Sequence, residues 1–319
     1  MKKIYVKDLK PNNTLFQERF MVKSSEIREG NAGKRHLHLT LGDNTTDVIA
    51  VKWSLSQKEV EDYSRIEPGM ILAILGKCSE YQGKLQIVID DIKQPAPGTY
   101  DMADFIKAAP ESSEDMYQYI IDTINSFSDT DFKDLCLNIY EERKEKILYW
   151  PAAMSHHHNE YGGYLWHVKR MVMQGKALCE IYPFLNRDLL LTGIILHDVE
   201  KISEMLSDEH GVVSDYSIRG KLLGHLVMGV EYIGDKCKEL LIDEEKTLVL
   251  QHMILAHHGQ PDWGSPKLPM IPEAEALHHI DMIDARMFTF EEALEFVEPG
   301  EMSDRNFSLN NRELYKTSF

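Results

Sequence analysis

The sequence predicts a multidomain protein in which a small β-barrel precedes an all-α bundle. Before residue 94, apolar residues recur mainly with the two-residue period of half-buried strands. After the Pro-Ala-Pro-Gly segment at residues 95–98, helical periodicity replaces that pattern and nothing resembles a strand. The chain has 319 residues, of which 43% are hydrophobic, so it can bury the cores of two domains.

The first domain, residues 1–93, contains a clear hairpin. Residues 35–41 alternate strictly, a turn-prone segment follows at 42–44, and residues 48–53 resume the strand pattern. Five short strands with one helix among them fit an OB-fold, and another small antiparallel barrel would fit the same pattern. The other expected strands are 14–22, 70–78 and 85–92, and the expected helix is 56–63.

Residues 94–150 are expected to form a linker and a helical lead-in, and residues 151–319 the helical domain. In the helix expected over 218–241, apolar residues fall on one face with the spacing of a core-facing stripe. That stripe comprises Leu222, Leu226, Val230, Ile233 and Cys237. The other expected helices are 101–108, 113–127, 131–148, 164–182, 188–201, 244–257 and 272–296.

Charge is divided unevenly between the two parts. Residues 1–98 hold 15 Lys and Arg against 13 Asp and Glu, whereas the remaining residues hold 20 against 39. Only the first part therefore suits a polyanion, since the acidic part repels phosphates unless bound cations change the local field.

No membrane partner is expected. The strongest apolar run, residues 189–196, is far too short to span a bilayer, and no apolar stretch follows the N-terminal lysines. Cys78, Cys136, Cys179 and Cys237 are widely spaced without a CxxC pair, so we interpret them as buried reduced thiols of a cytoplasmic protein.

The second half carries several residues of the types that bind divalent metals. Imidazole and carboxylate groups suit such metals, and their convergence would build a hydrolytic site for a phosphate ester. Because they come from different expected helices, one point in the bundle can collect them. A single buried histidine is more often a hydrogen-bonded core residue, but that reading does not explain the full set. The set comprises His167, His197, Asp198, His225, His257, His258 and Asp281.

Several short segments accompany this set in a fixed order. They are His156-His157-His158, Ile195-Leu196-His197-Asp198, Leu223-Gly224-His225, His257-His258-Gly259, Trp263-Gly264-Ser265-Pro266, Glu273-Ala274-Glu275-Ala276-Leu277-His278 and Asn311-Arg312-Glu313-Leu314-Tyr315-Lys316. The order H…HD…H…HH…D resembles the HD-domain metal-dependent phosphohydrolases. Over nearly the whole chain, the finer similarity is to the YhaM family of 3′-to-5′ exoribonucleases, which place an OB-fold before the HD domain.

The resemblance implies two divalent metal ions, with Mn2+ expected and Co2+, Fe2+, Ni2+ or Mg2+ as alternatives. Such a pair activates a water and offsets the charge that grows on the phosphate oxygens. Either residue of the His257-His258 doublet can bind, because neighbours on a helix point about 100° apart. The implied ligands are His167, His197, Asp198 and Asp281 for one metal, and bridging Asp198 with His225 and His257 or His258 for the other.

Further residues are expected near the chemistry besides Asp198. Lys201 is placed to contact the scissile phosphate, and a solvated lysine at a helix C-terminus is the alternative. His157 and His158 are expected on the substrate side, with a solvated loop end as the alternative. Glu200, the second residue after the His197-Asp198 pair, departs from the glycine usual in proteins of this resemblance. Its Cβ is expected to extend the helix or to alter a turn that needs a glycine conformation, and its carboxylate to weaken phosphate binding or to attract a cation.

In the barrel, basic residues are expected to follow a nucleic-acid backbone while Trp53, Phe20 or Tyr81 stacks on bases. Trp53 fits a core position equally well, because it shares strand parity with Ile49 and Val51. The candidate backbone contacts are Lys23, Lys34, Arg35, His36, His38 and Lys52.

Together these features predict a metal-dependent 3′-5′ exonuclease that degrades single-stranded RNA to nucleoside 5′-monophosphates, with single-stranded DNA as an alternative substrate. One alternative function is an HD-type phosphohydrolase of a small nucleotide. The other is a nucleic-acid-binding regulator whose metal-loaded site is impaired by Glu200. The sequence does not predict an oligomeric state.

Overall fold

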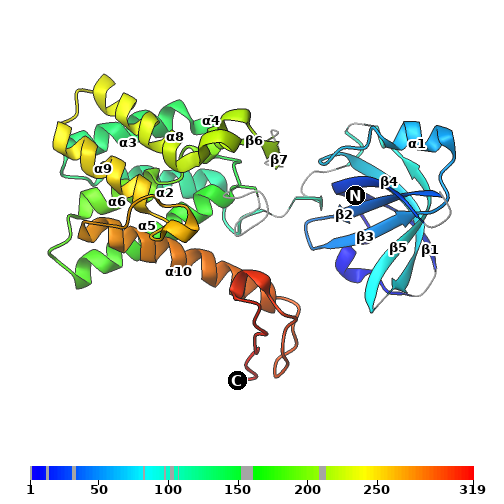
Figure 1. Cartoon of the computed structure of the whole chain (residues 1–319). Helices are drawn as coiled ribbons and strands as arrows, with labels where there is room; N and C mark the ends of the chain where they lie inside the picture. Colours follow the sequence, from blue (N-terminus) through cyan, green and yellow to red (C-terminus); the bar gives the residue numbers. More distant parts are fainter. Residues whose placement is uncertain are drawn as a thin grey trace. The chain divides into compact units, whose positions relative to one another are not determined.

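The computed structural model divides the chain into two compact units, residues 1–108 and 109–319. The first is a β-barrel and the second is helical (Figure 1), so the predicted fold class is confirmed. The structure describes residues 2–11, 14–30, 34–81, 83–96, 98–100, 104–106, 108–151, 161–207 and 213–319.

The barrel closes in the strand order β1-β2-β3-β5-β4. β1 pairs antiparallel with both β2 and β4, whereas β3 and β5 run parallel. With its single helix between β3 and β4, this is the five-stranded arrangement of an OB-fold. The elements are a 3-10 turn (Val6–Asp8), β1 (Leu15–Glu29), β2 (Arg35–Gly42), β3 (Asp47–Lys52), α1 (Gln57–Tyr63), β4 (Ile71–Tyr81) and β5 (Lys84–Lys93).

β1 is longer than the expected 14–22. Its register against β2 shifts between Val22 and Ser24, and the residues beyond this irregularity pair with β2 as far as Glu29. Because residues 23–29 are mostly polar, they carry no apolar alternation from which a strand could be predicted. Inside the barrel, Leu37, Leu39 and other apolar side chains form a core of their own.

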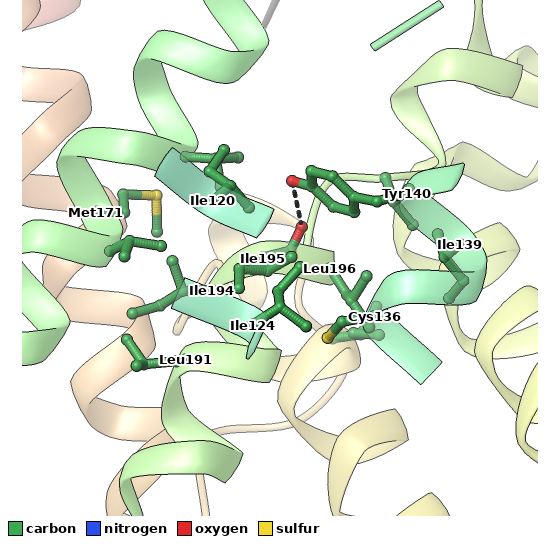
Figure 2. Packing of buried hydrophobic residues seen from close by; sticks show 14 of the residues in the cluster. Ile120, Ile124, Cys136, Ile139, Tyr140, Met171, Leu191, Ile194, Ile195 and Leu196 are labelled. Atoms are coloured by element: carbon green, nitrogen blue, oxygen red, sulfur yellow. Dashed lines mark hydrogen bonds between the residues drawn. The ribbon is translucent and has the colours of Figure 1, made fainter. Parts of the chain in front are cut away.

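The helical unit is built around α6. Every residue of α6 from Asp188 to Leu196 is buried, which is the pattern of a helix enclosed on all sides. Figure 2 shows Met171, Ile120 and Tyr140 among the residues of its apolar core, and the Tyr140 hydroxyl donates to the Ile195 carbonyl at 3.3 Å. The elements of this unit are α2 (Ser113–Asn125), α3 (Thr130–Glu142), α4 (Lys144–Ile147), α5 (Gly163–Ile181), α6 (Arg187–Leu196), α7 (Lys201–Glu204), β6 (Met205–Ser207), β7 (Val213–Tyr216), α8 (Ile218–Glu239), α9 (Glu244–Ala256), a 3-10 turn (Pro261–Trp263), α10 (Pro272–Leu294) and a 3-10 turn (Phe307–Leu309).

Several element predictions for this part were wrong. β6 and β7 form a small antiparallel sheet, whose strands are too short to show a period in the sequence. The helix expected over 101–108 is not α-helical at its described residues: residue 104 is 3-10 helical, 105, 106 and 108 are non-helical, and Phe105 is fully buried. The helix expected over 131–148 breaks at Arg143, and the one expected over 188–201 ends at Leu196.

No helix in the described part of the chain combines the length and apolarity needed to span a membrane. The four cysteines are free thiols, of which Cys179 is half-buried and the others are buried.

α8 is broken near its start at Gly224, whose φ of 71° and ψ of 160° lie outside the helical region. This break shifts the phase of the helix, so the apolar stripe expected from the sequence does not continue through it. Leu222 is 77% exposed, whereas Ile233 on the other side of the break is fully buried. The expected core position of Leu222 is therefore wrong, and this residue lies at the surface.

A pair of alanine substitutions in α8 tests this break. Ile233→Ala should lower the free energy of unfolding by about 2–5 kcal/mol, because it leaves a cavity in the core. Leu222→Ala should change it by less than about 0.5 kcal/mol, since the side chain is exposed. Urea denaturation followed by circular dichroism measures both, and equal losses would place Leu222 in the core after all.

Candidate functional site

All seven candidate ligands converge within the helical unit. His167 lies near the start of α5, His197 caps the end of α6, His225 follows the break in α8, His257 caps the end of α9 and Asp281 lies in α10. Their ligand atoms form overlapping groups in which all members lie within 4.8 Å of one another. These groups are His167, His197 and Asp198; His225, His257 and His258; and His197, His257 and Asp281.

Helix ends fix the orientation of His197 and His257. The last carbonyls of a helix lack intrahelical donors. The Nδ1–H of His197 donates to the Ile194 carbonyl at 2.8 Å, and that of His257 donates to the Ile254 carbonyl at 2.8 Å. His258 makes the equivalent bond, also 2.8 Å, to the Trp263 carbonyl. In each of these rings the bond at Nδ1 therefore leaves Nε2 as the nitrogen that a metal can bind.

Carboxylates orient the other two imidazoles. His167 Nδ1 lies 2.8 Å from Asp284 Oδ2, and the other oxygen of Asp284 pairs with Arg170 Nε at 2.8 Å. His225 Nδ1 lies 3.1 Å from Glu204 Oε2, while the backbone N–H of His225 donates to Glu204 Oε1 at 3.0 Å. Both rings thereby direct Nε2 toward the same cluster.

Sequence reasoning missed Asp284 and Glu204. Asp284 had a signal, because it follows Asp281 by three residues and so lies on the same face of α10. No sequence signal pointed to Glu204, because its partner His225 is 21 residues away and the intervening β6–β7 segment was not predicted.

The free atoms of the cluster fit a metal centre. In the described part of the chain, the Nε2 atoms of His197, His225 and His257 and Oδ1 of Asp198 are buried and form no hydrogen bond. Such groups cost about 1–3 kcal/mol each when unsatisfied, so their convergence requires an explanation. Imidazole nitrogen and carboxylate oxygen are ligands that suit transition-metal cations, and coordination would satisfy them together.

Asp198 lies between the histidines. Its Oδ2 is 3.2 Å from His197 Nε2 and 2.7 Å from Lys201 Nζ. Its Oδ1 is 3.4 Å from His225 Nε2 and 3.6 Å from His257 Nε2. The two oxygens thus face different imidazoles, which is the geometry of a carboxylate able to bridge two cations.

The protonation of the histidines depends on their neighbours. Burial by itself would lower the pKa of His167, but hydrogen bonds with Asp281 and Asp284 outweigh it and raise that pKa to about 9. Burial lowers the pKa of His257 to about 3, so this ring is neutral and ready to act as a ligand. At neutral pH a cation at His167 replaces a proton.

Both aspartates of the cluster are ionised. Burial would raise the pKa of Asp198, but the charges of His197 and Lys201 outweigh it and hold that pKa well below its ordinary value. Burial would likewise raise the pKa of Asp281, but the hydrogen bond from His167 outweighs it and lowers that pKa. The cluster therefore presents anionic oxygens beside its imidazole rings.

Lys201 begins α7 and is not a solvated lysine at a helix C-terminus. Its side chain is only 13% exposed and its ammonium group pairs with Asp198. Burial would lower its pKa, but Asp198 outweighs burial and raises it. A fixed positive charge therefore lies beside the cluster. His157 and His158 lie outside the described residues.

Glu200 has an ordinary backbone conformation and a paired carboxylate. Its φ of −79° is ordinary for any residue, so the turn after the HD pair needs no glycine. Its carboxylate is buried and pairs with Arg143 at 2.5 Å. The Arg143 guanidinium also lies 4.1 Å from the centre of the Tyr232 ring and donates to Ser203 Oγ. The expected strain at Glu200 was therefore wrong, whereas its expected effect on phosphate binding stays a prediction, now for a carboxylate that Arg143 already pairs.

In the barrel, Trp53 is 56% exposed, so the core alternative was wrong for this residue. Its ring packs on His36 with 5.0 Å between centroids, on the face of β2 opposite the buried Leu37. Of the other stacking candidates, Tyr81 is exposed whereas Phe20 is fully buried and unavailable. His38 lies on the same face of β2 as His36, and Lys23, Lys34 and Arg35 are exposed.

Lys52 is less free than the other candidates. Its ammonium group donates to the Asp90 carbonyl at 2.7 Å and lies 3.5 Å from the Glu59 carboxylate. The outer face of β2 and the end of β3 thus offer one exposed indole and two imidazoles, on the surface by which OB-folds bind oligonucleotides.

The fold and the cluster define a metal-dependent hydrolase of the HD class with a nucleic-acid-binding barrel. Residues 164–286 match the model of the HD domain, and residues 21–94 match that of the OB-fold nucleic acid binding domain. The 3′-5′ exoribonuclease YhaM of Geobacillus sp. (strain WCH70) is 39% identical over 300 residues, which cover 94% of this chain and 91% of that protein. The 3′-5′ exoribonuclease YhaM of Bacillus subtilis (strain 168) is 36% identical over 300 residues, covering 94% of each. The chain belongs to the YhaM family.

Among solved structures, the second OB-fold domain of replication protein A from Methanococcus maripaludis aligns with a TM-score of 0.24 at 19% identity, over 30% of this chain and 98% of that chain.

The HD domain implies that divalent metal is bound, and the imidazole and carboxylate groups of the cluster fit this requirement.

A pair of glutamine substitutions tests the role of Glu200. Glu200→Gln should lower the free energy of unfolding by about 3–5 kcal/mol, because it leaves the Arg143 charge buried without its partner. Glu239→Gln is the matched control, since the Glu239 side chain is 63% exposed and its ion pair with Lys236 should contribute less than about 1 kcal/mol. Thermal melts compare them, and faster hydrolysis by Glu200→Gln without loss of stability would restore the view that this carboxylate opposes phosphate binding.

Proposed function

We propose that this protein is a metal-dependent exonuclease that degrades single-stranded RNA from its 3′ end and releases nucleoside 5′-monophosphates. The observation that carries the proposal is the set of five imidazoles whose Nδ1 atoms are held by fixed acceptors and which fall, with Asp198 and Asp281, into overlapping groups of close ligand atoms. The YhaM relatives are named as exoribonucleases, and the barrel matches a nucleic-acid-binding domain.

The proposed ligands divide between two divalent cations, with Mn2+ as the favoured metal. When bound, such cations activate a water and offset charge on the phosphate oxygens. Both histidines of the doublet are proposed to bind, because His257 and His258 lie in one group with His225. The proposed ligands are His167, His197, Asp198 and Asp281 for the first cation, and Asp198, His225, His257 and His258 for the second.

Side chains of the protein are proposed to hold the cations and to bind the substrate. Asp198 holds its two oxygens toward opposite sides of the cluster, and Lys201 places a positive charge beside it to contact the scissile phosphate. In the barrel, Trp53 stacks on a base while Lys34, Arg35 and their neighbours follow the backbone of the incoming strand. The free thiols suit a reducing compartment, and we propose the cytoplasm.

The two alternative functions are less favoured. A phosphohydrolase of a small nucleotide has no use for a barrel that matches nucleic-acid-binding domains. A regulator with an impaired site was suggested by Glu200, whose carboxylate is already paired with Arg143.

Digestion of a 5′-labelled single-stranded RNA, with each candidate divalent metal, tests the proposed function. We expect stepwise shortening from the 3′ end and release of 5′-monophosphates. The same sequence as DNA measures the preference between the two nucleic acids. Turnover of free nucleotides alone, or retention of RNA without cleavage, would replace the proposal by one of the alternatives.

Asp198→Ala should abolish binding of both cations, because it removes the only carboxylate shared by the two proposed ligand sets. Loss of several kcal/mol of charge stabilisation slows hydrolysis by at least about 100-fold. Asp235→Ala, at an exposed position of α8, is the matched control and should leave both properties unchanged. Elemental analysis of the dialysed proteins measures the metal, and full occupancy in Asp198→Ala would exclude the bridging role.

Asp284→Asn and Glu204→Gln should weaken metal binding by about 10- to 100-fold each, because they remove the acceptors that orient His167 and His225. Titration of the metal-free proteins with Mn2+, followed by calorimetry, measures the change. The two variants should affect different cations, so the double variant should lose affinity at both. Unchanged binding in both single variants would show that the rings hold their orientation without the carboxylates.

A further inference from the structure

Trp263 is an exposed aromatic residue attached to the proposed metal centre. Its side chain is 55% exposed, although it lies in a short 3-10 turn, Pro261–Trp263, that is closely tied to the cluster. The Trp263 carbonyl accepts the Nδ1–H of His258 at 2.8 Å, and His258 belongs to the ligand group with His225 and His257. The backbone of residue 263 is therefore separated from the cluster by one imidazole ring.

The indole ring has a rigid support. It packs on the His278 ring, with 5.9 Å between centroids and 36° between the ring planes. His278 is buried, and its Nδ1 lies 3.0 Å from the His257 carbonyl. On its own side, the His278 ring packs so tightly against Gly259 that a Cβ there would lie 2.3 Å from it, and the φ of 76° at Gly259 also favours glycine. The Gly259 backbone, the His278 ring and the Trp263 indole thus form a stack fixed to the ligand His257.

The charge of the helical part limits how it can hold RNA. Residues 99–319 contain 20 Lys and Arg against 39 Asp and Glu, so general attraction between this part and a polyanion is unfavourable. Stacking of a base on an aromatic ring needs no net charge, and it tolerates any sequence because every base has a π-face. An enzyme that removes nucleotides one after another requires this tolerance at the terminal position.

We propose that Trp263 is the residue on which the base of the 3′-terminal nucleotide stacks, so that the terminal phosphodiester is positioned at the metal centre. This inference rests on the proposed function and specifies how the same site holds its substrate. Trp263 is a substrate-binding residue and takes no part in holding the cations, since what it offers to the ligand His258 is its backbone carbonyl and not its indole ring.

Kinetics with two matched substrates test this role. One is a short RNA with an intact 3′-terminal nucleotide, and the other is the same RNA with a 3′-terminal abasic ribose. Trp263→Ala should raise KM for the first by about 5- to 150-fold, the range of base–aromatic stacking, and leave kcat and the metal content nearly unchanged. On the abasic substrate, the variant and the original protein should be alike. Trp263→Phe should recover most of the loss, and Phe184→Ala is a matched control at another exposed aromatic residue.

Equilibrium binding gives a second measurement that needs no catalysis. Fluorescence anisotropy of the two labelled RNAs in EDTA should show that Trp263→Ala loses the preference for the intact terminal nucleotide. Equal losses on both RNAs, or no loss on either, would overturn the proposal, and so would a change of oligomeric state as the main effect of Trp263→Ala. If the original protein cleaved no RNA, the proposed function would fail, and the anisotropy would still decide whether Trp263 binds the terminal base.

Discussion

The site depends on hydrogen bonds made by the Nδ1 atoms of its histidines. An imidazole can offer only one nitrogen lone pair to a cation, and the partner of the other nitrogen decides which one. Here His197 and His257 bond to carbonyls that the ends of α6 and α9 leave without helical donors. The same bonds satisfy carbonyls at the helix ends and determine which ring nitrogen faces a cation. The local fold and the metal chemistry therefore depend on the same contacts.

The central helix explains why these bonds hold their geometry. α6 is buried along its length from Asp188 and ends immediately before the His197-Asp198 pair. A close-packed interior permits little movement, so the pair is held by the core itself. By contrast, His225 follows the non-helical Gly224 and is fixed mainly by Glu204, which bonds both its ring and its backbone.

Much of this arrangement could be predicted from the sequence, because it depends on local pattern and residue type. Alternating side chains located the barrel strands, and the types and order of the ligands located the cluster. Features that depend on contacts distant in sequence could not be predicted. Glu200 meets Arg143 across 57 residues, and Leu222 is turned outward by a backbone break that its helical spacing does not reveal. Glu204 supports a histidine only because β6 and β7 bring the chain back.

The pairing of Arg143 with Glu200 also constrains how this chain can diverge. A glycine at the position of Glu200 would supply no carboxylate to a guanidinium. A chain with that change alone would keep a buried cation without its carboxylate, and one that lost Arg143 alone would keep a buried anion. The two positions are therefore expected to change together during evolution, so a sequence with glycine after the HD pair should carry an uncharged residue at the position of Arg143.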